Sequence, residues 1–205
     1  MRDQVLWMRH GTCLDGLCRP HAHARPGTPL TTRGITEVVN TARRLLHLST
    51  KPDVILTSPL PRATMSARIL SEILGAPIAP PDPLYAEWRS PDCVLGLSPD
   101  DYPSEYQAWR SERLRDPDSA LPGGESLTAL RQRAMEAVSR AHEAAQQGAV
   151  LIVSHRVFID RPWPPPWMAT EARKKPSRAR VGHELVSKPR VGLRGRVVGR
   201  VPRPR

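Results

Sequence analysis

The sequence has few cysteines and no long apolar run. Its three cysteines, Cys13, Cys18 and Cys93, are too few and too irregularly spaced for the disulfide framework of a secreted domain. No apolar stretch approaches the roughly 20 residues that cross a membrane. The amino terminus runs directly into an expected strand, so we expect no signal peptide there. These absences predict a cytoplasmic protein with no membrane partner.

Strong positive charge is also lacking from most of the chain. The formal net charge of +11 over 205 residues would by itself suggest a nucleic-acid-binding protein. Residues 160–205, however, contain 13 of the 31 basic residues and 3 of the 20 acidic ones, which leaves residues 1–159 with 18 and 17. The body is therefore nearly neutral, so we do not expect nucleic acid as a partner; any contact with it would be made only through the basic end.

This charge distribution divides the chain into two predicted parts. Residues 1–159 form one domain, which is long enough for a sizeable core. Residues 160–205 are rich in proline and arginine, with eight prolines and no helical or strand periodicity. Such a composition cannot bury a core, so we expect a disordered tail. Its aromatic residues are Trp163 and Trp167 only, so specific base stacking is not expected.

Three short apolar runs carry the strongest functional signal. Residues 5–8 lead into Arg9 and His10, residues 150–153 lead into His155, and residues 54–56 lead through a short turn to Arg62. Short apolar runs bounded by turn residues are typical of buried parallel strands. Ligands of such sheets bind outside the carboxyl ends of the strands. Two imidazoles and two guanidiniums meeting there, without an obvious metal cage, indicate a site for a phosphoryl group.

Helical periodicity separates these strands. It predicts helices over residues 32–46, 59–74 and 126–147, a short strand near residues 78–79, and a further helix over residues 100–113. The order of strands and helices is typical of an α/β sandwich. Residues 82–122 form a loop-rich insertion, which we expect to act as a lid over the crevice.

Six sequence elements in this order resemble the histidine phosphatase superfamily, which includes the cofactor-dependent phosphoglycerate mutases. They are Arg9-His10-Gly11, Leu30-Thr31 with Gly34, residues 57–63, Glu87, residues 122–126 and Ser154-His155. The resemblance implies a phosphoglycerate mutase-like fold, a three-layer sandwich with a mostly parallel sheet and helices on both faces. It also implies a fold that is incomplete at the carboxyl end, because the family continues past the second histidine with a helix and a strand. The replaced end is interpreted either as a frameshift product or as a divergent native tail.

The resemblance also implies the catalytic chemistry. His10 is the candidate nucleophile, since neutral imidazole can form a covalent phospho-intermediate near pH 7. Gly11 would let the backbone approach the phosphate closely. Together with Thr12 it is assigned to substrate binding.

The remaining site residues are assigned to charge stabilisation and proton transfer. Arg9 and Arg62 would clamp the phosphoryl oxygens, because the planar guanidinium binds phosphate in bidentate fashion. His155 would donate a hydrogen bond to the same group. Glu87 is the candidate general acid, with a pKa raised by burial and Trp88 as apolar cover; the alternative is a solvated loop glutamate.

Departures from the family pattern shape the functional prediction. The mutases carry Glu-Thr after Arg-His-Gly, whereas Thr12-Cys13 follows here, and Arg156 replaces a glycine after His155. We therefore predict a metal-independent phosphomonoester hydrolase that needs no cofactor and acts on a small phosphorylated substrate. A mutase-type phosphoryl transferase and an inactive binding protein with a basic tail are the alternatives. A zinc site at Cys13, Cys18, His21 and His23 fits the usual ligand spacing poorly.

Overall fold

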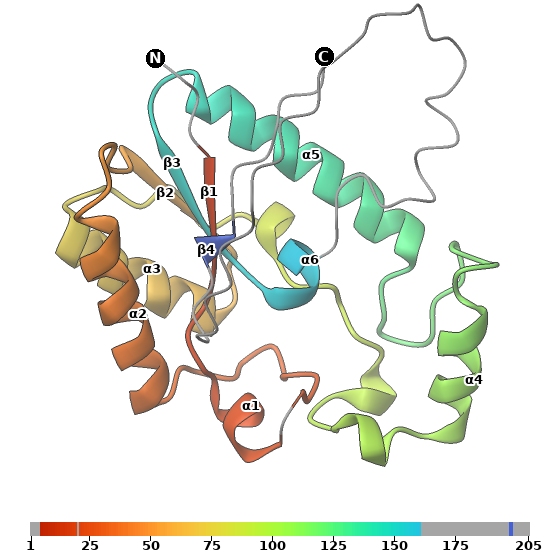
Figure 1. Ribbon diagram of the computed structural model, residues 1–205. Coiled ribbons are helices and arrows are strands. Elements are labelled where there is room, and N and C mark those ends of the chain that lie inside the picture. The colour runs from red at the N-terminus through yellow and green to blue at the C-terminus, as the bar shows by residue number, and fades with distance from the viewer. Residues whose placement is uncertain (1–4, 20, 161–196, 199–205) are drawn as a thin grey trace, which may run out of the picture.

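The computed structural model describes residues 5–19, 21–160 and 197–198, which form a sheet between helices (Figure 1). The strands are β1 (Val5–Arg9), β2 (Val54–Thr57), β3 (Val150–Ser154) and β4 (Val197–Val198). They lie in the order β2-β3-β1-β4, with β3 parallel to β1 and β2, and β4 antiparallel to β1. The predicted α/β fold with a mostly parallel sheet is confirmed.

Helices cover both faces of this sheet. The main ones are α2 (Thr32–Leu45), α3 (Pro61–Leu74), α5 (Leu127–Ala145) and the short α6 (Arg156–Asp160). Side chains of a strand alternate between its two faces. Trp7 and Ile152 accordingly share a core with α5, whereas Met8 and Val153 share a second core with α2 and α3. Two cores on opposite faces of one sheet make the three layers that the resemblance implied.

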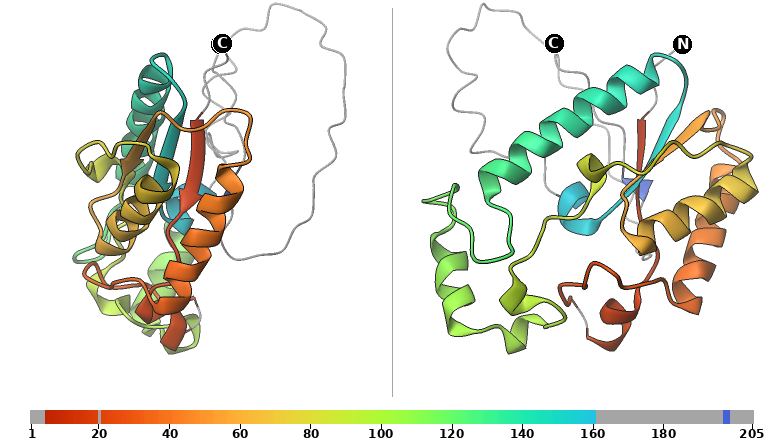
Figure 2. Two further views of the ribbon diagram at one scale, coloured as in Figure 1. Left: turned by 90° about the vertical axis from the view of Figure 1, so that its left-hand side faces the viewer. Right: turned by 180° about the vertical axis from the view of Figure 1, so that it is seen from behind.

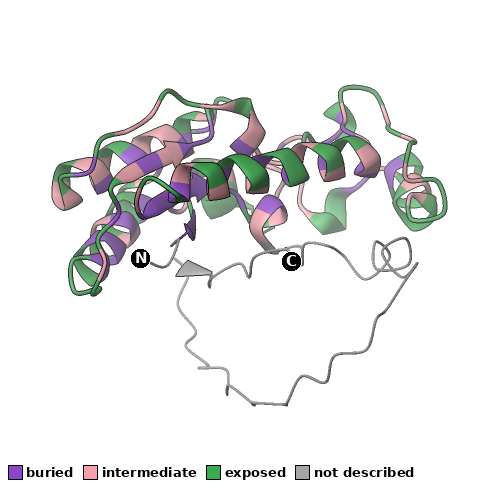
Figure 3. Ribbon diagram, turned by 90° about the horizontal axis from the view of Figure 1, so that it is seen from above, coloured by how far each residue is buried: buried purple, intermediate pink, exposed green. Residues whose placement is uncertain are grey.

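Local capping fixes where the helices begin and end. The hydroxyl of Thr31 accepts a hydrogen bond from Gly34 N at the start of α2, and Ser126 does the same for Ala129 N at the start of α5. Helix α3 ends at Gly75, whose φ of 73° lies in the left-handed region. Figure 3 shows buried and exposed residues alternating along these amphipathic helices.

The segments between the main elements gather at the carboxyl ends of the strands. They contain α1 (Leu14–Cys18), α4 (Ser104–Glu112) and 3₁₀ turns at Pro83–Tyr85, Asp92–Val94 and Pro99–Asp101. Both views of Figure 2 place α1 and α4 at the same end of the molecule. His23 joins the two segments, since its N–H donates to Leu97 O over 3.2 Å and its carbonyl accepts from Gly96 N over 2.7 Å.

Some expectations need correction. The strand predicted near residues 78–79 is only a single parallel bridge between Ile78 and Ile55, because the flanking Pro77 and Pro80 have no N–H to extend a ladder. Helix α1 was missed because it buries no residue and so has no apolar periodicity. The tail predicted for residues 160–205, with the incomplete carboxyl end, lies outside the described residues apart from Asp160 and β4. None of the helices within the described ranges combines the length and apolar character of a membrane crossing.

Candidate active site

The carboxyl ends of β1, β2 and β3 bring three polar residues together. His10 follows β1, and its N–H donates to Ser154 O over 3.0 Å. Ser58 follows β2, and its hydroxyl lies 2.8 Å from Nε2 of His155, which follows β3. The rings of His10 and His155 meet edge to face with their centroids 5.0 Å apart. The parallel register therefore places the two predicted histidines side by side.

The hydrogen bonds of His10 determine its tautomer. Nδ1 lies 2.6 Å from the carbonyl oxygen of Gly11, and a carbonyl can only accept, so Nδ1 carries the proton. Nε2 therefore presents its lone pair. His10 is only 7% exposed, and burial, followed by the charges of Arg62 and Arg9, lowers its pKa from 6.5 to about 3. The imidazole is thus neutral, with an unprotonated Nε2.

Arg62 is placed by the first turn of α3. It is 2% exposed, and its Nε donates to Nε2 of His10 over 3.2 Å. Its Nη1 donates to the carbonyls of Arg25 and Pro26 over 3.1 and 3.4 Å. The guanidinium is therefore held between the first loop and His10. Helix α3 directs its positive end toward the same place.

His155 is fully buried, and burial followed by the charge of His10 keeps its pKa well below 6.5. Its Nδ1 is buried and has no hydrogen-bond partner among the described residues. Such a nitrogen is costly to bury unless a ligand meets it. A phosphoryl oxygen beside His10 is a suitable acceptor for an N–H at this position.

The carboxylate of Glu87 lies beside the first turn of α6. Its carboxylate accepts from the amides of Trp88, Val157 and Phe158 over 3.0, 3.3 and 3.1 Å. Burial is the largest influence and raises its pKa, against these hydrogen bonds and the charge of Arg62. Trp88 contributes its backbone N–H, and its indole packs against His23 and Trp109. Glu87 is therefore a fixed, half-buried carboxyl group rather than a solvated one.

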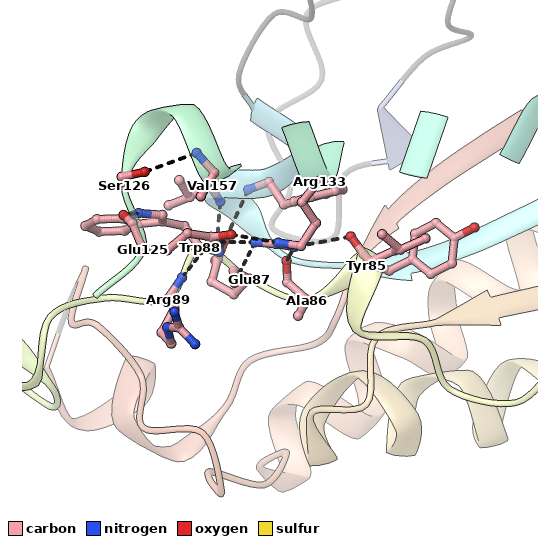
Figure 4. A network of polar contacts seen from close by, with 12 residues as sticks. Tyr85, Ala86, Glu87, Trp88, Arg89, Glu125, Ser126, Arg133 and Val157 are labelled. Carbon is pink, nitrogen blue, oxygen red and sulfur yellow. Dashed lines mark hydrogen bonds and ion pairs between the residues drawn. The ribbon is translucent and has the colours of Figure 1, made fainter. Parts of the chain in front are cut away.

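A salt bridge that sequence reasoning missed holds the segment around Glu87 (Figure 4). Arg133 of α5 binds Glu125 through Nε and Nη2, over 2.8 and 2.7 Å. Its guanidinium also donates to Ala86 O over 2.7 Å and to Glu87 O over 3.3 Å. Glu125 belonged to the family motif, but nothing in a single sequence indicates that Arg133, eight residues further on and within α5, would bind the backbone at Glu87. Arg133 therefore positions the candidate acid.

The chain after His10 is packed tightly against α2. A Cβ on Gly11 would collide with the carbonyl oxygen of Gly34, so the close approach that requires glycine here is to α2. The hydroxyl and N–H of Thr12 both donate to Glu37, over 2.8 and 3.0 Å to Oε2. Glu37, which sequence reasoning missed, also pairs with Arg33. Thr12 therefore lines the cavity as part of a hydrogen-bonded cluster with Glu37 and Arg33.

A cavity of about 940 Å³ opens over these groups. The predicted residues that line it are Arg9, His10, Thr12, Arg62 and Glu87, whereas Gly11 and His155 are not among its lining residues. The far part is lined by the insertion and the first loop, including His23, Tyr102 and Tyr106. The insertion predicted to cover the crevice therefore forms one of its walls.

Arg156 contacts His21, one of the candidate zinc ligands. Arg156 lines the cavity and donates from Nη1 to Nδ1 of His21 over 3.0 Å. His23 is bonded to Ser90 through Nδ1 over 2.7 Å. Cys13 is buried and Cys18 exposed. Within the described ranges, no three histidine, cysteine or acidic side chains are grouped as metal ligands.

The chain is similar in sequence and in fold to known proteins. The sequence model of the histidine phosphatase superfamily (branch 1) matches residues 5–161. "Uncharacterized phosphatase PhoE" of Bacillus subtilis is 28% identical over 76% of this chain and 72% of its own length. "Probable phosphoglycerate mutase GpmB" of Yersinia pestis is 29% identical over 76% and 71%. The crystal structure of the α-ribazole phosphatase from Shigella flexneri aligns with a TM-score of 0.61 at 29% identity, over 76% of this chain and 75% of that one.

Proposed function

The chain belongs to the histidine phosphatase superfamily, and on that premise we propose that it is a phosphomonoester hydrolase with a phosphohistidine intermediate. The observation that carries the proposal is the orientation of His10. Its Nδ1–H is bonded to Gly11 O, so that Nε2 keeps a lone pair, which accepts the Nε–H of Arg62 where both residues line the cavity. A neutral, oriented imidazole beside fixed guanidiniums is suited to attack on phosphorus.

In the first step, Nε2 of His10 attacks the phosphorus atom in line with the ester oxygen. The N–P bond forms as the bond from phosphorus to the ester oxygen breaks. Arg9 and Arg62 carry the charge of the phosphoryl oxygens. To His155, which lies beside His10, the proposal assigns a hydrogen bond to one of these oxygens from Nδ1, which has no partner among the described residues. Fixed donors aimed at developing charge lower the barrier without reorganisation. Phosphoryl transfer depends mainly on such positioning.

Glu87 supplies the proton that the leaving oxygen needs. Oε1 accepts two backbone amides and Oε2 accepts one, so Oε2 is the oxygen with room for a proton. In the first step that proton passes to the ester oxygen and releases the alcohol. In the second step a water attacks phosphorus, Glu87 accepts the proton of the water, and the N–P bond breaks. Inorganic phosphate leaves, and His10 and Glu87 return to their starting states.

A mutase-type transferase is the second candidate, because the GpmB relative carries that name. It would share the first step and return the phosphoryl group to a second hydroxyl instead of water. We favour hydrolysis because Thr12 and Cys13 replace the mutase Glu-Thr, and because Thr12 is engaged by Glu37. The three unpaired cysteines support a reducing, cytoplasmic setting for this reaction.

Hydrolysis of 4-nitrophenyl phosphate by the full chain tests the proposal. We expect turnover by the wild type and a loss of at least about 10³-fold in His10→Asn, since the residual rate would come from binding and charge alone. His47→Asn is the matched control, because His47 is exposed and lies outside the cavity, and it should keep full activity. A wild type without phosphatase or transferase activity would leave the inactive binding protein as the function.

A further inference from the structure

The guanidinium of Arg62 is held by backbone carbonyls as well as by His10. Its Nη1 donates to Arg25 O and Pro26 O over 3.1 and 3.4 Å, and its Nε donates to Nε2 of His10 over 3.2 Å. Nη2 has no hydrogen bond to any described residue, so its N–H groups are available to a phosphoryl oxygen. The position of Arg62 therefore depends on where these two carbonyls lie.

The two carbonyls belong to a turn over residues 25–28. Thr28 N donates to Arg25 O over 3.2 Å, which closes the turn. Pro26 and Gly27 occupy its two central positions, and both residue types favour turns. The turn lies between α1 and α2, outside the helices and strands of the described residues. Its position therefore needs a restraint from elsewhere.

The side chain of Asp15, in the first turn of α1, supplies that restraint. Its Oδ2 accepts from Arg25 N over 2.8 Å and from the hydroxyl of Thr28 over 2.6 Å, and its Oδ1 accepts from Nη1 of Arg25 over 3.1 Å. One carboxylate thus binds both the first and the last residue of the turn. The side chain of Asp15 is only 13% exposed and Thr28 is buried, so water competes little for these bonds.

The charge of Asp15 also acts on Arg62. Burial by itself would raise the pKa of Asp15, but hydrogen bonds to the turn and then the charges of Arg25 and Arg62 bring that pKa below its ordinary value. Asp15 is therefore ionised at neutral pH and attracts the guanidinium of Arg62. Asp15 is not among the residues that line the cavity, so any effect on the reaction must pass through other residues.

We propose that Asp15 is a positioning residue for phosphoryl transfer: its carboxylate fixes the turn at residues 25–28, and the turn directs the guanidinium of Arg62 at the phosphoryl oxygens. The inference rests on the proposed function for what Arg62 does in the reaction, whereas the placement of Arg62 by Asp15 can be tested without turnover. It also gives a role to the short helix α1, which buries no residue of its own.

Two replacements of Asp15 separate its hydrogen bonds from its charge. In Asp15→Asn the amide oxygen can still accept from both ends of the turn, so kcat/KM for 4-nitrophenyl phosphate should stay within about threefold of the wild type. In Asp15→Ala all three bonds are lost, and we expect a fall of about 10–10²-fold, the cost of a misplaced group. An Asp15→Asn variant as slow as Asp15→Ala would overturn the role of the turn.

Asp101→Ala is the matched control for these variants. Asp101 also pairs with an arginine near α1, with 3.6 Å between its Oδ2 and Nη1 of Arg19. It does not line the cavity, and its printed contacts do not include the turn at residues 25–28. The Asp101→Ala variant should keep the wild-type rate.

A double-mutant cycle shows whether Asp15 acts through Arg62. In an Arg62→Gln background, Asp15→Ala should slow the reaction further by less than about twofold, because the group that Asp15 positions is gone. A full additional loss in that background would overturn the inference, and so would a wild-type rate in Asp15→Ala. If Asp15→Ala does not fold, Thr28→Val takes its place, because it removes only one bond to Asp15. It should cost about threefold with the same coupling to Arg62, and an unchanged rate would overturn the inference in the same way.

The pKa of His10, followed by NMR titration, reports the position of Arg62 independently of catalysis. After burial, the charge of Arg62 is the largest cause of the low pKa of His10. If Arg62 moves away in Asp15→Ala, the pKa of His10 should rise above about 3, whereas removal of an acid at unchanged geometry could only lower it. A wild type without turnover whose His10 pKa rises in this way would refute the phosphatase and retain the positioning role. Normal hydrolysis, with the rate and the His10 pKa unchanged in Asp15→Ala, would refute the positioning role alone.

Discussion

The Nε–H of Arg62 points at the Nε2 lone pair of His10 over 3.2 Å. A cation that donates to the nucleophilic nitrogen keeps the imidazole neutral, since a proton on Nε2 would face a positive charge. In the proposed reaction Nε2 gives up this hydrogen bond as it forms the N–P bond, and the Nε–H of Arg62 becomes free to donate to a phosphoryl oxygen. The same guanidinium would thus keep His10 neutral before the reaction and stabilise charge during it.

Replacement of Arg62 by lysine tests this dual role. Lysine keeps the charge but loses the planar fork. We expect kcat/KM to fall by about 10²–10³-fold, the usual cost of one transition-state donor. Arg62→Gln should additionally raise the pKa of His10 from about 3, which NMR titration can follow. An unchanged pKa in Arg62→Gln would show that burial alone keeps His10 neutral.

Glu87→Gln separates proton transfer from binding. An alkyl phosphate needs a proton on its leaving oxygen, so its hydrolysis should slow by about 10²–10⁴-fold, whereas 4-nitrophenyl phosphate should be affected much less. Because burial raises the pKa of Glu87, its proton is retained above the usual range and the wild-type rate falls as pH rises through that pKa. This basic limb should vanish in the variant. Glu136→Gln, on the exposed face of α5, is the control, and equal slowing of both substrates would remove Glu87 from the role of acid.

Arg133 should act on the reaction through Glu87. In Arg133→Leu, Glu125 stays buried without its partner, which should lower the free energy of unfolding by about 3 kcal/mol. The freed backbone at Ala86 and Glu87 should also displace the carboxyl group, so that alkyl phosphates lose more activity than 4-nitrophenyl phosphate. Urea unfolding and the two rates measure this, and Arg133→Lys should restore part of both. A loss of stability with unchanged selectivity between leaving groups would make the salt bridge merely structural.

The low pKa of His10 predicts how the free energy of unfolding depends on pH. The folded pKa of His10 is about 3, below its unfolded value of 6.5, so the unfolded chain takes up the proton first as pH falls. The full stability is present above pH 6.5 and is lost progressively toward pH 3. Between pH 7.5 and 5, His10 should cost about 2 kcal/mol of unfolding free energy. Urea unfolding at both pH values should show His10→Asn losing about 2 kcal/mol less than the wild type, and equal losses would contradict the neutral state of His10.

The sequence predicted the catalytic end of the site because its residues adjoin strands. His10 and His155 follow apolar runs directly, and Arg62 follows a turn that opens a helix. Position along a parallel strand determines position at the sheet edge, so these three could be placed without coordinates. In the structure Arg62 donates a hydrogen bond to His10, and the rings of His10 and His155 lie edge to face.

The end of the cavity away from His10 could not be predicted from positions along the strands. Arg110, Arg133 and Glu37 lie on helices, and each reaches the cavity or its support only through tertiary packing. A helical arginine has the same local pattern on a solvated face as in a cavity wall. The strand at residues 78–79 failed for a related reason, since its apolar character was clear but the neighbouring prolines limited its pairing to one residue.

Trapping of the covalent intermediate tests the central claim most directly. The full chain would be mixed with ³²P-labelled 4-nitrophenyl phosphate and quenched in alkali within milliseconds, and the labelled peptide would be identified by mass spectrometry. We predict an alkali-stable, acid-labile phosphoryl group on His10, formed and lost at rates that match turnover. Steady hydrolysis without labelled protein, or with the label on another residue, would contradict the account.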